Sequence, residues 1–181
     1  MPIGIRTTRQ LRIESSSGFS ELRNLRTTVR VSSAREPLRF YSELQCEQSP
    51  TEVWDYFLDF KQWPNWSPIC VECRPTTSGT IIVGSVLLIR FRVLWFTISV
   101  NAPIVDYEPG RSITWTGKKF GLNAIHSYRF VANSTGTQMS NEEIIFCDSR
   151  FVRWLIKGWY RATNLSRASL EGIRREVEKQ N

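Results

Sequence analysis

Alternating apolar and polar residues dominate the chain from Leu38 to Cys147 and predict a series of β-strands. The alternation breaks at clusters of glycine, proline, asparagine and serine, which are typical turn residues. We expect strands at 38–47, 69–74, 80–92, 95–107, 111–119, 123–132 and 137–147. Because the connections between the later strands are short, the pattern predicts an antiparallel meander.

Helical patterns interrupt this series once and then end it. Ser49, Pro50 and Glu52 have the order of a capping box, which predicts a helix from residue 50, and residues 59–68 predict a second short helix that ends at prolines. One long final helix is predicted over 149–180, where these residues recur at helical spacing: Phe151, Leu155, Trp159, Ala162, Leu165, Ser169, Ile173 and Val177. The predicted fold class is α+β: a curved antiparallel β-sheet of about seven strands wrapped around a long C-terminal α-helix, with two short helices between the first two strands.

His126 is the only histidine of the chain and lies within the predicted strand 123–132. The segment that follows this strand, residues 133–136, has strong turn character. If Asn133 pairs with Gly136, the register places His126 directly opposite Glu143. A carboxylate beside an imidazole fixes the tautomer of the ring, so His126 and Glu143 are the candidate catalytic pair for acid–base chemistry.

Two further hairpin registers predict which residues share a face of the sheet. The turns favour pairing of Lys119 with Ala124 and of Tyr107 with Ser112. One face then becomes apolar and contains Val83, Leu87, Ile89, Phe91, Phe96, Ile98, Val100, Ile104, Ile113, Trp115, His126, Tyr128, Phe130, Met139, Asn141, Glu143 and Ile145. The opposite face is polar. The registers were derived from the turns alone, so this separation into an apolar and a polar face supports them.

The net charge of +7 is concentrated near the N-terminus. Residues 1–36 contain seven arginines and three acidic residues among many hydroxyl residues, whereas residues 37–181 suit one globular domain. We therefore expect a basic N-terminal extension, which is a mitochondrial or plastid transit peptide, a disordered tail or an extra terminal helix on the domain. No apolar run reaches the roughly 18 residues that a membrane span needs, so a soluble, intracellular protein is expected. No nucleic-acid-binding pattern is present, so we expect no nucleic-acid partner.

The four cysteines, Cys46, Cys70, Cys73 and Cys147, do not form a metal-binding pattern. Residues three apart on a strand point to opposite faces, so Cys70 and Cys73 make a poor pair of metal ligands. No second close pair and no histidine stand nearby to complete a site. We expect reduced cysteines, no metal site and no cofactor.

These features together resemble a known family, the SRPBCC (START/Bet v 1-like) superfamily with its helix-grip fold, and within it the polyketide cyclase/dehydrase-like members. The resemblance covers Leu38 to Lys179. It rests on residues 49–55, 59–68, Gly84, 113–117, 126–130, 136–137 and Glu143. The sequence departs from the family pattern in two respects, because the Arg-rich extension lies outside the usual domain and no glycine follows soon after Glu143.

The resemblance implies a ligand site between the sheet and the C-terminal helix. Our first hypothesis is binding of a hydrophobic small molecule, such as a lipid, polyketide, terpenoid or quinone. The second is a cofactor-independent cyclase or dehydratase that uses His126 and Glu143, and the third is a protein-binding module like the helix-grip activators of chaperones. The expected ligand contacts are Trp115, Tyr128, Asn141, Met139, Phe91, Phe96, Phe130 and Trp159.

Aromatic and basic residues also stand side by side in the predicted C-terminal helix. Trp154 and Trp159 lie close to Arg150, Arg153 and Lys157. A helix end of this composition can rest on an anionic lipid surface, so peripheral membrane contact is a further hypothesis. For Trp159, packing in the core is the better interpretation. The sequence predicts no oligomeric state.

Overall fold

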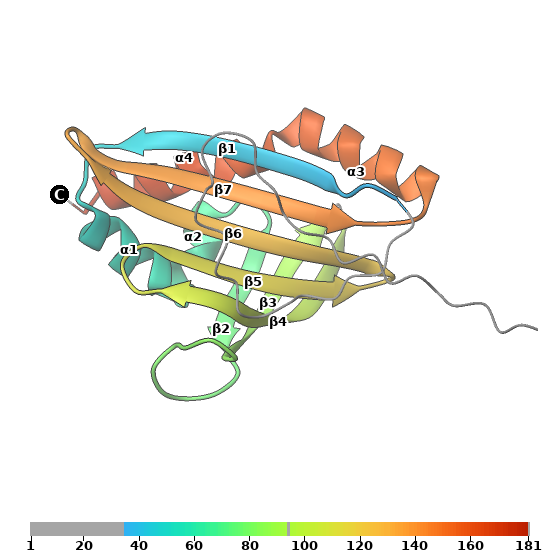
Figure 1. The fold of residues 1–181 in the computed structure, drawn as a ribbon, viewed down its shortest axis with the longest axis horizontal. Helices are drawn as coiled ribbons and strands as arrows, with labels where there is room; N and C mark the ends of the chain where they lie inside the picture. The colour runs from blue at the N-terminus through green and yellow to red at the C-terminus, as the bar shows by residue number, and fades with distance from the viewer. Residues whose placement is uncertain (1–34, 94, 181) are drawn as a thin grey trace, which may run out of the picture.

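Seven antiparallel strands form one curved sheet in the part of the chain that the computed structural model describes, residues 35–93 and 95–180 (Figure 1). Their order is β1-β7-β6-β5-β4-β3-β2, so the predicted meander is confirmed and the first strand pairs with the last. The predicted basic extension lies outside the described residues, except for residues 35 and 36. The strands are β1 Leu38–Cys46, β2 Cys70–Pro75, β3 Val86–Val93, β4 Phe96–Glu108, β5 Ser112–Lys119, β6 Leu122–Asn133 and β7 Gly136–Phe146.

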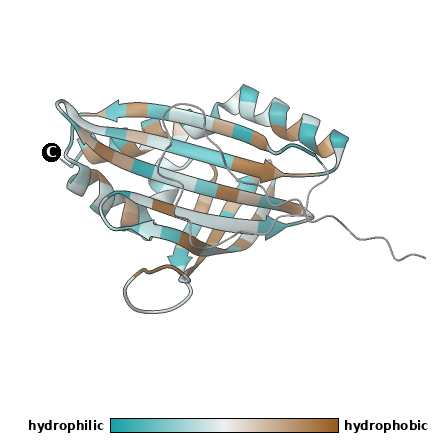
Figure 2. Cartoon of the chain, viewed as in Figure 1, coloured by the Kyte–Doolittle hydropathy of each residue, from teal (hydrophilic) through white to brown (hydrophobic). Residues whose placement is uncertain are grey.

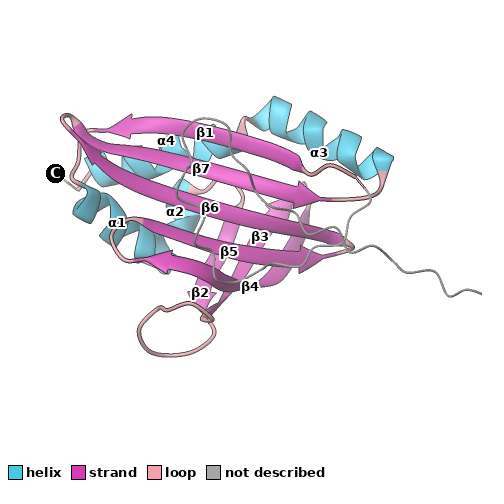
Figure 3. Ribbon diagram, viewed as in Figure 1, coloured by secondary structure: helices cyan, strands magenta, loops and turns pink. Residues whose placement is uncertain are grey.

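Short helices follow β1, and two longer ones follow β7. They are α1 Pro50–Leu58, η2 Phe60–Gln62, α2 Trp63–Trp66, α3 Arg150–Thr163 and α4 Leu165–Glu178. The predicted capping box is confirmed, because the Ser49 side chain accepts the Glu52 N–H and the Glu52 carboxylate accepts the Ser49 N–H at 2.9 Å. Figure 3 shows α1, α2 and α4 behind the sheet, whereas α3 lies beyond β1 at the upper right.

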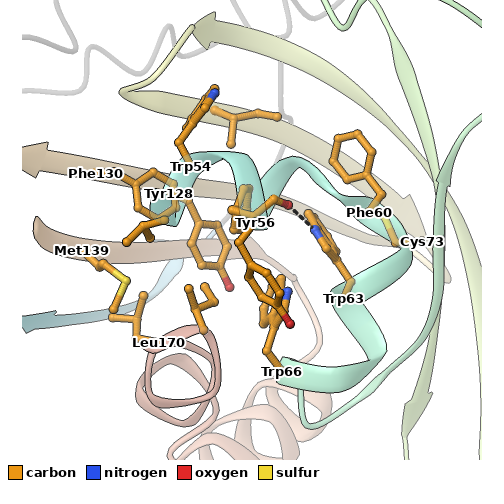
Figure 4. Close-up of a cluster of buried hydrophobic side chains, with 14 of the residues drawn as sticks. Trp54, Tyr56, Phe60, Trp63, Trp66, Cys73, Tyr128, Phe130, Met139 and Leu170 are labelled. Atoms are coloured by element: carbon orange, nitrogen blue, oxygen red, sulfur yellow. Dashed lines mark hydrogen bonds between the residues drawn. The ribbon is translucent and has the colours of Figure 1, made fainter. Parts of the chain in front are cut away.

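The core lies between the inner face of the sheet and the helices α1, α2 and α4 (Figure 4). Phe57 of α1 stands at its centre, with ring centroids between 4.9 and 5.7 Å from those of Trp63, Trp66, Tyr128 and Phe130. Burial of one such side chain contributes about 1.5–3 kcal/mol. Aromatic packing therefore holds α1 and α2 on the sheet.

The predicted long C-terminal helix is present but bends at Asn164. This residue adopts the left-handed conformation (φ 46°, ψ 43°), which asparagine tolerates better than most residues, and its N–H donates to the Tyr160 carbonyl at 2.9 Å. α4 packs on the sheet and buries Leu165, Leu170, Ile173 and Val177. None of the fourteen described residues of α3 is buried. The expectation that the whole segment covers the apolar face is thus corrected, because only α4 does so.

The β5–β6 register differs from the predicted one by two residues. Lys119 pairs with Leu122 and not with Ala124. The connection is a two-residue turn, in which Phe120 and Gly121 both have positive φ angles of 50° and 75°. A shift of two residues leaves every side chain on the same face, so the predicted faces of β6 survive the error.

A β-bulge changes the predicted β4–β5 pairing. Ser112 pairs with Glu108 and not with Tyr107. The register shifts by one residue between Ile104 and Asp106, where β4 carries one extra residue. The predicted pairing near the turn was therefore wrong. Beyond the bulge the predicted register holds, because Ile104 pairs with Trp115, three residues along each strand from the predicted pair of Tyr107 and Ser112.

The strand predicted over 80–92 is shorter in the structure, because β3 begins at Val86. Val83, which was predicted on the apolar face, is 49 % exposed in the preceding loop. Gly84 has a φ angle of 94°, which interrupts the extended backbone before β3. The apolar face therefore starts later along this strand.

Cys70 and Cys73 lie on the same face and not on opposite faces as predicted. The register of β2 shifts between Cys70 and Glu72, so Cys70 pairs with Phe91 and Cys73 with Ile89. Burial raises the pKa of the Cys70 thiol to about 11 and that of the Cys73 thiol further still. Both side chains pack against the core as neutral thiols, and the described residues contain no cluster of three metal-ligating side chains.

Two helical glycines allow the packing of α4 to be tested. A Cβ at Gly172 would overlap the backbone carbonyl of Trp66, whereas a Cβ at Gly158 of α3 meets nothing within 4 Å. We expect Gly172→Ala to lower the free energy of unfolding by about 1–3 kcal/mol, because α2 and α4 must separate. Gly158→Ala is the matched control and should raise it by up to about 1 kcal/mol, the usual gain of alanine in a helix. Urea denaturation measures both, and equal effects would contradict the close approach.

Candidate functional site

The β6–β7 register is the predicted one and brings His126 and Glu143 together on the inner face. Asn133 pairs with Gly136 at the turn, and Nε2 of His126 lies 2.7 Å from Oε1 of Glu143. The Glu143 side chain is 10 % exposed and that of His126 is 28 % exposed. The pair therefore lies at the edge of the core, with the imidazole on its more open side.

Tyr160 of α3 completes this cluster, although no sequence pattern indicated a role for this residue. Its hydroxyl donates to Oε2 of Glu143. Its ring stacks on Phe40 of β1, with centroids 3.7 Å apart and planes inclined by 14°. The position of Tyr160 depends on the bend at Asn164, which no hydrophobic periodicity reveals. Both carboxylate oxygens of Glu143 thus have a donor.

Trp115 of β5 forms a stacked row with two neighbouring rings of the inner face. The His126 imidazole lies parallel to the indole at 5.5 Å with an interplanar angle of 3°, and the Tyr128 ring lies at 5.6 Å with an angle of 10°. Trp115 pairs with His126 in the sheet register. The buried indole therefore holds the imidazole plane in one orientation beside Glu143.

Tyr128 and Asn141 form a second polar pair deeper under α4. The Asn141 amide donates to the Tyr128 hydroxyl at 3.0 Å. Burial raises the pKa of Tyr128 well above its usual range, although a hydrogen bond with Ser169 acts in the opposite direction. The carbonyl oxygen of Asn141 and the hydroxyl of Ser166 are buried without a hydrogen-bond partner among the described residues. Such unsatisfied groups can accept a bond from a bound molecule.

The arrangement leaves one nitrogen of His126 available for chemistry. With Nε2 on the carboxylate, Nδ1 has no hydrogen-bond partner among the described residues. A neutral imidazole that donates through Nε2 presents Nδ1 as an acceptor. Glu143 therefore orients the ring, and Nδ1 is the atom that can contact or deprotonate a ligand.

The remaining predicted ligand contacts do not all lie at this cluster. Met139 and Phe130 are fully buried in the core beyond Asn141, and Phe91 of β3 is half-buried. Phe96 is 60 % exposed at the start of β4, and Trp159 of α3 is half-buried. The structure groups Trp115, Tyr128 and Asn141 with the His126–Glu143 pair, while Phe96 lies at the outer end of its strand.

Exposure increases along the inner face from the α4 side toward α3. Leu87, Ile104 and Phe130 are fully buried under the helices, whereas Ile98 and Ala124 are half-buried. α3 packs on β1 and α4 and reaches β7 through the side chain of Tyr160, but it does not extend across the other strands. The described helices therefore leave the inner face less covered on the side where His126 lies, and the side chain of this residue is 28 % exposed. A small polar depression occurs elsewhere, on the outer face, lined by Asp106, Ser112, Thr114, Ser127, Tyr128, Arg129, Ser140 and Glu142.

The chain belongs to the family described as polyketide cyclase/dehydrase and lipid transport, whose model matches residues 38–178. This match spans most of the described domain and confirms the resemblance seen in the sequence. No curated protein matches the chain.

Solved structures of the same fold include aromatase/cyclases. The Zhui aromatase/cyclase from Streptomyces sp. R1128 is 13 % identical, with a TM-score of 0.67 over 80 % of this chain and 95 % of its own. The di-domain ARO/CYC StfQ from the steffimycin biosynthetic pathway is 11 % identical, with a TM-score of 0.65 over 80 % of this chain and 52 % of its own. Ara h 8.0201 is 13 % identical, with a TM-score of 0.58 over 79 % of this chain and 99 % of its own.

The chain spans about half the length of the di-domain proteins that it matches. At these identities the likeness shows the fold, and the helix-grip architecture is thereby confirmed. It assigns neither a substrate nor a reaction to this chain.

A double-mutant cycle tests the bond between Tyr160 and Glu143. Tyr160→Phe keeps the stacking on Phe40 and removes the hydroxyl, so its combination with Glu143→Gln should show a coupling free energy of about 1 kcal/mol in urea unfolding. Tyr41→Phe with Glu43→Gln is the control, because this 2.7 Å bond lies on the exposed surface and should couple by only about 0.3 kcal/mol. Equal couplings would show that Tyr160 does not hold α3 in place.

Proposed function

We propose that the protein binds a hydrophobic small molecule on the part of the inner face beside α3 that the described helices leave uncovered. The ligand class is that of the first hypothesis, a lipid, polyketide, terpenoid or quinone. The observation that carries the proposal is the position of the His126–Glu143–Tyr160 cluster at the edge of an apolar surface that the described helices leave uncovered.

The surroundings supply the apolar contacts that such a ligand needs. Phe40 and Ala124 line the inner face beside the cluster, and Phe91 and Ile98 lie farther away on β3 and β4; all four are only half-buried. Half-buried apolar side chains gain from further burial, at roughly 25 cal/mol per Å² of apolar area. The family description, which includes lipid transport, agrees with a ligand of this kind.

Polar contacts would fix the orientation of the ligand. Nδ1 of His126 can accept a bond from a ligand hydroxyl, and the Asn141 carbonyl oxygen lies two residues along the strand from Glu143 on the same face. A few convergent polar groups in an apolar site are typical of small-molecule recognition. The pattern favours a ligand with a hydroxyl or enol group on an otherwise apolar skeleton.

A second candidate function is that of a cofactor-independent cyclase or dehydratase. The observation in its favour is that Glu143 accepts from Nε2 and leaves Nδ1 free, which is the arrangement of an oriented general base. Nδ1 would take a proton from carbon next to a carbonyl, forming an enolate and an imidazolium that Glu143 stabilises. The imidazolium would return the proton to a departing hydroxyl, which leaves as water.

Binding of a hydroxynaphthoquinone, followed by tryptophan quenching, tests the first function. His126→Ala should weaken affinity about tenfold, the equivalent of about 1.4 kcal/mol, because the ligand loses its polar contact. Ser127→Ala changes the adjacent residue on the outer face and should leave the affinity unchanged. Absence of binding, or equal losses in both variants, would argue against the proposed site.

Proton exchange separates the two candidates. We expect an enzyme of the second class to accelerate deuterium incorporation at the enolisable carbon of benzoylacetone in D₂O, measured by NMR. His126→Ala should abolish this acceleration, whereas Glu142→Gln, on the outer face, should retain it. Binding without any acceleration would leave the first function standing and exclude catalysis on this substrate class.

A further inference from the structure

α3 exposes large apolar side chains to solvent. Phe151 is 67 % exposed, Trp154 68 % and Leu155 47 %, and the rings of Phe151 and Trp154 lie 6.2 Å apart. The half-buried residues of α3, including Tyr160, lie on the other side of the helix. Exposed apolar clusters on a soluble domain indicate a binding surface.

Basic residues border this apolar stripe. Arg150, Lys157 and Arg161 are exposed, and α3 contains four basic residues and no acidic one. Figure 2 shows hydrophilic and hydrophobic residues side by side along the helix. Aromatic and leucine residues on one side with lysine and arginine on the other are typical of helices that lie in the plane of a membrane interface. No described helix is both long and apolar enough to cross a membrane.

Two hairpin ends expose aromatic residues in the same way. Trp95 is 77 % exposed and Phe96 60 % at the start of β4, and Phe120 is 79 % exposed in the β5–β6 turn. Lys119 lies beside the latter, with Nζ 5.5 Å from the ring centroid. Phe120 also has a φ angle of 50°, a strained conformation for a bulky residue in a position where glycine or asparagine is usual. An exposed phenylalanine at a strained position points to a role beyond folding.

These protrusions lie at one end of the sheet. The β5–β6 turn is next to the end of β7, since Asn123 pairs with Phe146, and α3 begins four residues later. A Cβ at Gly117 would lie 3.2 Å from Val100, so β4 runs beside the end of β5 and starts at the same end. We name this surface the rim, and it comprises Arg92, Trp95, Phe96, Lys118, Lys119, Phe120, Arg150, Phe151, Trp154, Leu155, Lys157 and Arg161.

We propose that the rim docks on the surface of an anionic phospholipid bilayer, with α3 lying along the headgroup layer. The apolar side chains stand on three protrusions and not in a groove, so a deformable, flat partner can accept all of them at once. The surrounding cations match the negative surface potential of anionic lipids. Trp154 and Phe151 would reach the boundary between headgroups and acyl chains, where aromatic rings are favoured.

Charge argues against the other occupants of this surface. A second copy of the chain would bring an equally basic α3 against the first, and like charges repel. The N-terminal segment of residues 1–36 contains seven arginines and three acidic residues, so it is also a poor electrostatic match. In the docked state the uncovered part of the inner face would be turned toward the lipid. If the proposed function holds, this orientation shortens the path of an apolar ligand through water.

Cosedimentation of the full chain with vesicles tests the proposal. We expect binding to vesicles in which phosphatidylglycerol replaces part of the phosphatidylcholine, and weak binding to phosphatidylcholine alone. Phe151→Ser with Trp154→Ser should weaken the partition at least about tenfold, because the exposed rings supply the apolar contact. Lys157→Glu with Arg161→Glu should weaken it by at least about tenfold as well, and salt that shortens the Debye length from about 10 Å to about 3 Å should have a similar effect.

Matched controls separate the rim from other surfaces. Ile82→Ser removes an exposed apolar residue of the loop that precedes β3, and Lys61→Glu reverses an exposed charge on η2. Both should leave vesicle binding unchanged. His126→Ala should also bind vesicles normally, so loss of the ligand site and loss of docking are distinguishable. Hydrogen exchange of α3 should slow on addition of anionic vesicles.

Several outcomes would overturn the proposal. Vesicle binding that persists in both rim variants would assign it to the arginine-rich N-terminal segment. Self-association that the rim substitutions abolish, measured by light scattering, would assign the surface to a second copy. Absence of binding to any vesicle would leave an acidic protein surface as the matching partner and would exclude the membrane.

Discussion

The arrangement of the site depends on the pairing of the Glu143 carboxylate with its two donors. The Glu143 side chain is nearly buried, and a buried carboxylate is costly unless its oxygens are paired. One oxygen accepts from His126 on the neighbouring strand, and the other accepts from Tyr160 on α3. A single side chain thus joins β6, β7 and α3. Because α3 buries none of its own described residues, this polar contact and the stacking of Tyr160 on Phe40 explain why the helix lies where it does.

The two halves of the C-terminal helix serve the inner face in different ways. α4 approaches α2 so closely that only glycine fits at position 172, and the aromatic residues of α1 and α2 fill the space beneath. α3 instead leaves the sheet at Asn164 and remains near its edge. One end of the inner face is consequently a packed core, and the other end offers half-buried apolar side chains beside His126. The ligand of the proposed function would bind at the second end without disturbing the packing of the first.

Each part of the structure was predicted correctly only where the local sequence marks it strongly. The turn at 133–136 is strongly marked, so the register that unites His126 with Glu143 was predicted correctly. The turn at Phe120 was missed because a bulky residue with positive φ is rare, and the bulge near Asp106 leaves no trace in an alternating pattern. The predicted faces of β6 are nevertheless correct, because the error at the Phe120 turn is a shift of two residues, which leaves each side chain on its face.

Tyr160 could not be predicted for a related reason. Its contact with Glu143 depends on the bend at Asn164. Whether an asparagine inside a helical pattern adopts the left-handed conformation is determined by tertiary contacts and not by the local sequence. The resemblance to a known family indicated the fold and the inward face of the sheet, but it carried no information about which helix residues would reach the carboxylate. Long-range polar contacts of this kind are set by three-dimensional packing and not by periodicity.

The link between Tyr160 and Glu143 also bears on how the site opens. α3 has little apolar burial, so its local stability is low compared with that of α4. Movement of α3 away from the sheet would break the Tyr160 bond and leave Glu143 with His126 as its one remaining donor. That loss is offset when an incoming hydroxyl donates to the same oxygen, because the carboxylate is then paired again. In the proposed function, opening of α3 and binding of a hydroxylated ligand would therefore be coupled through one carboxylate, and a membrane that holds the outer side of α3 would act on the same equilibrium.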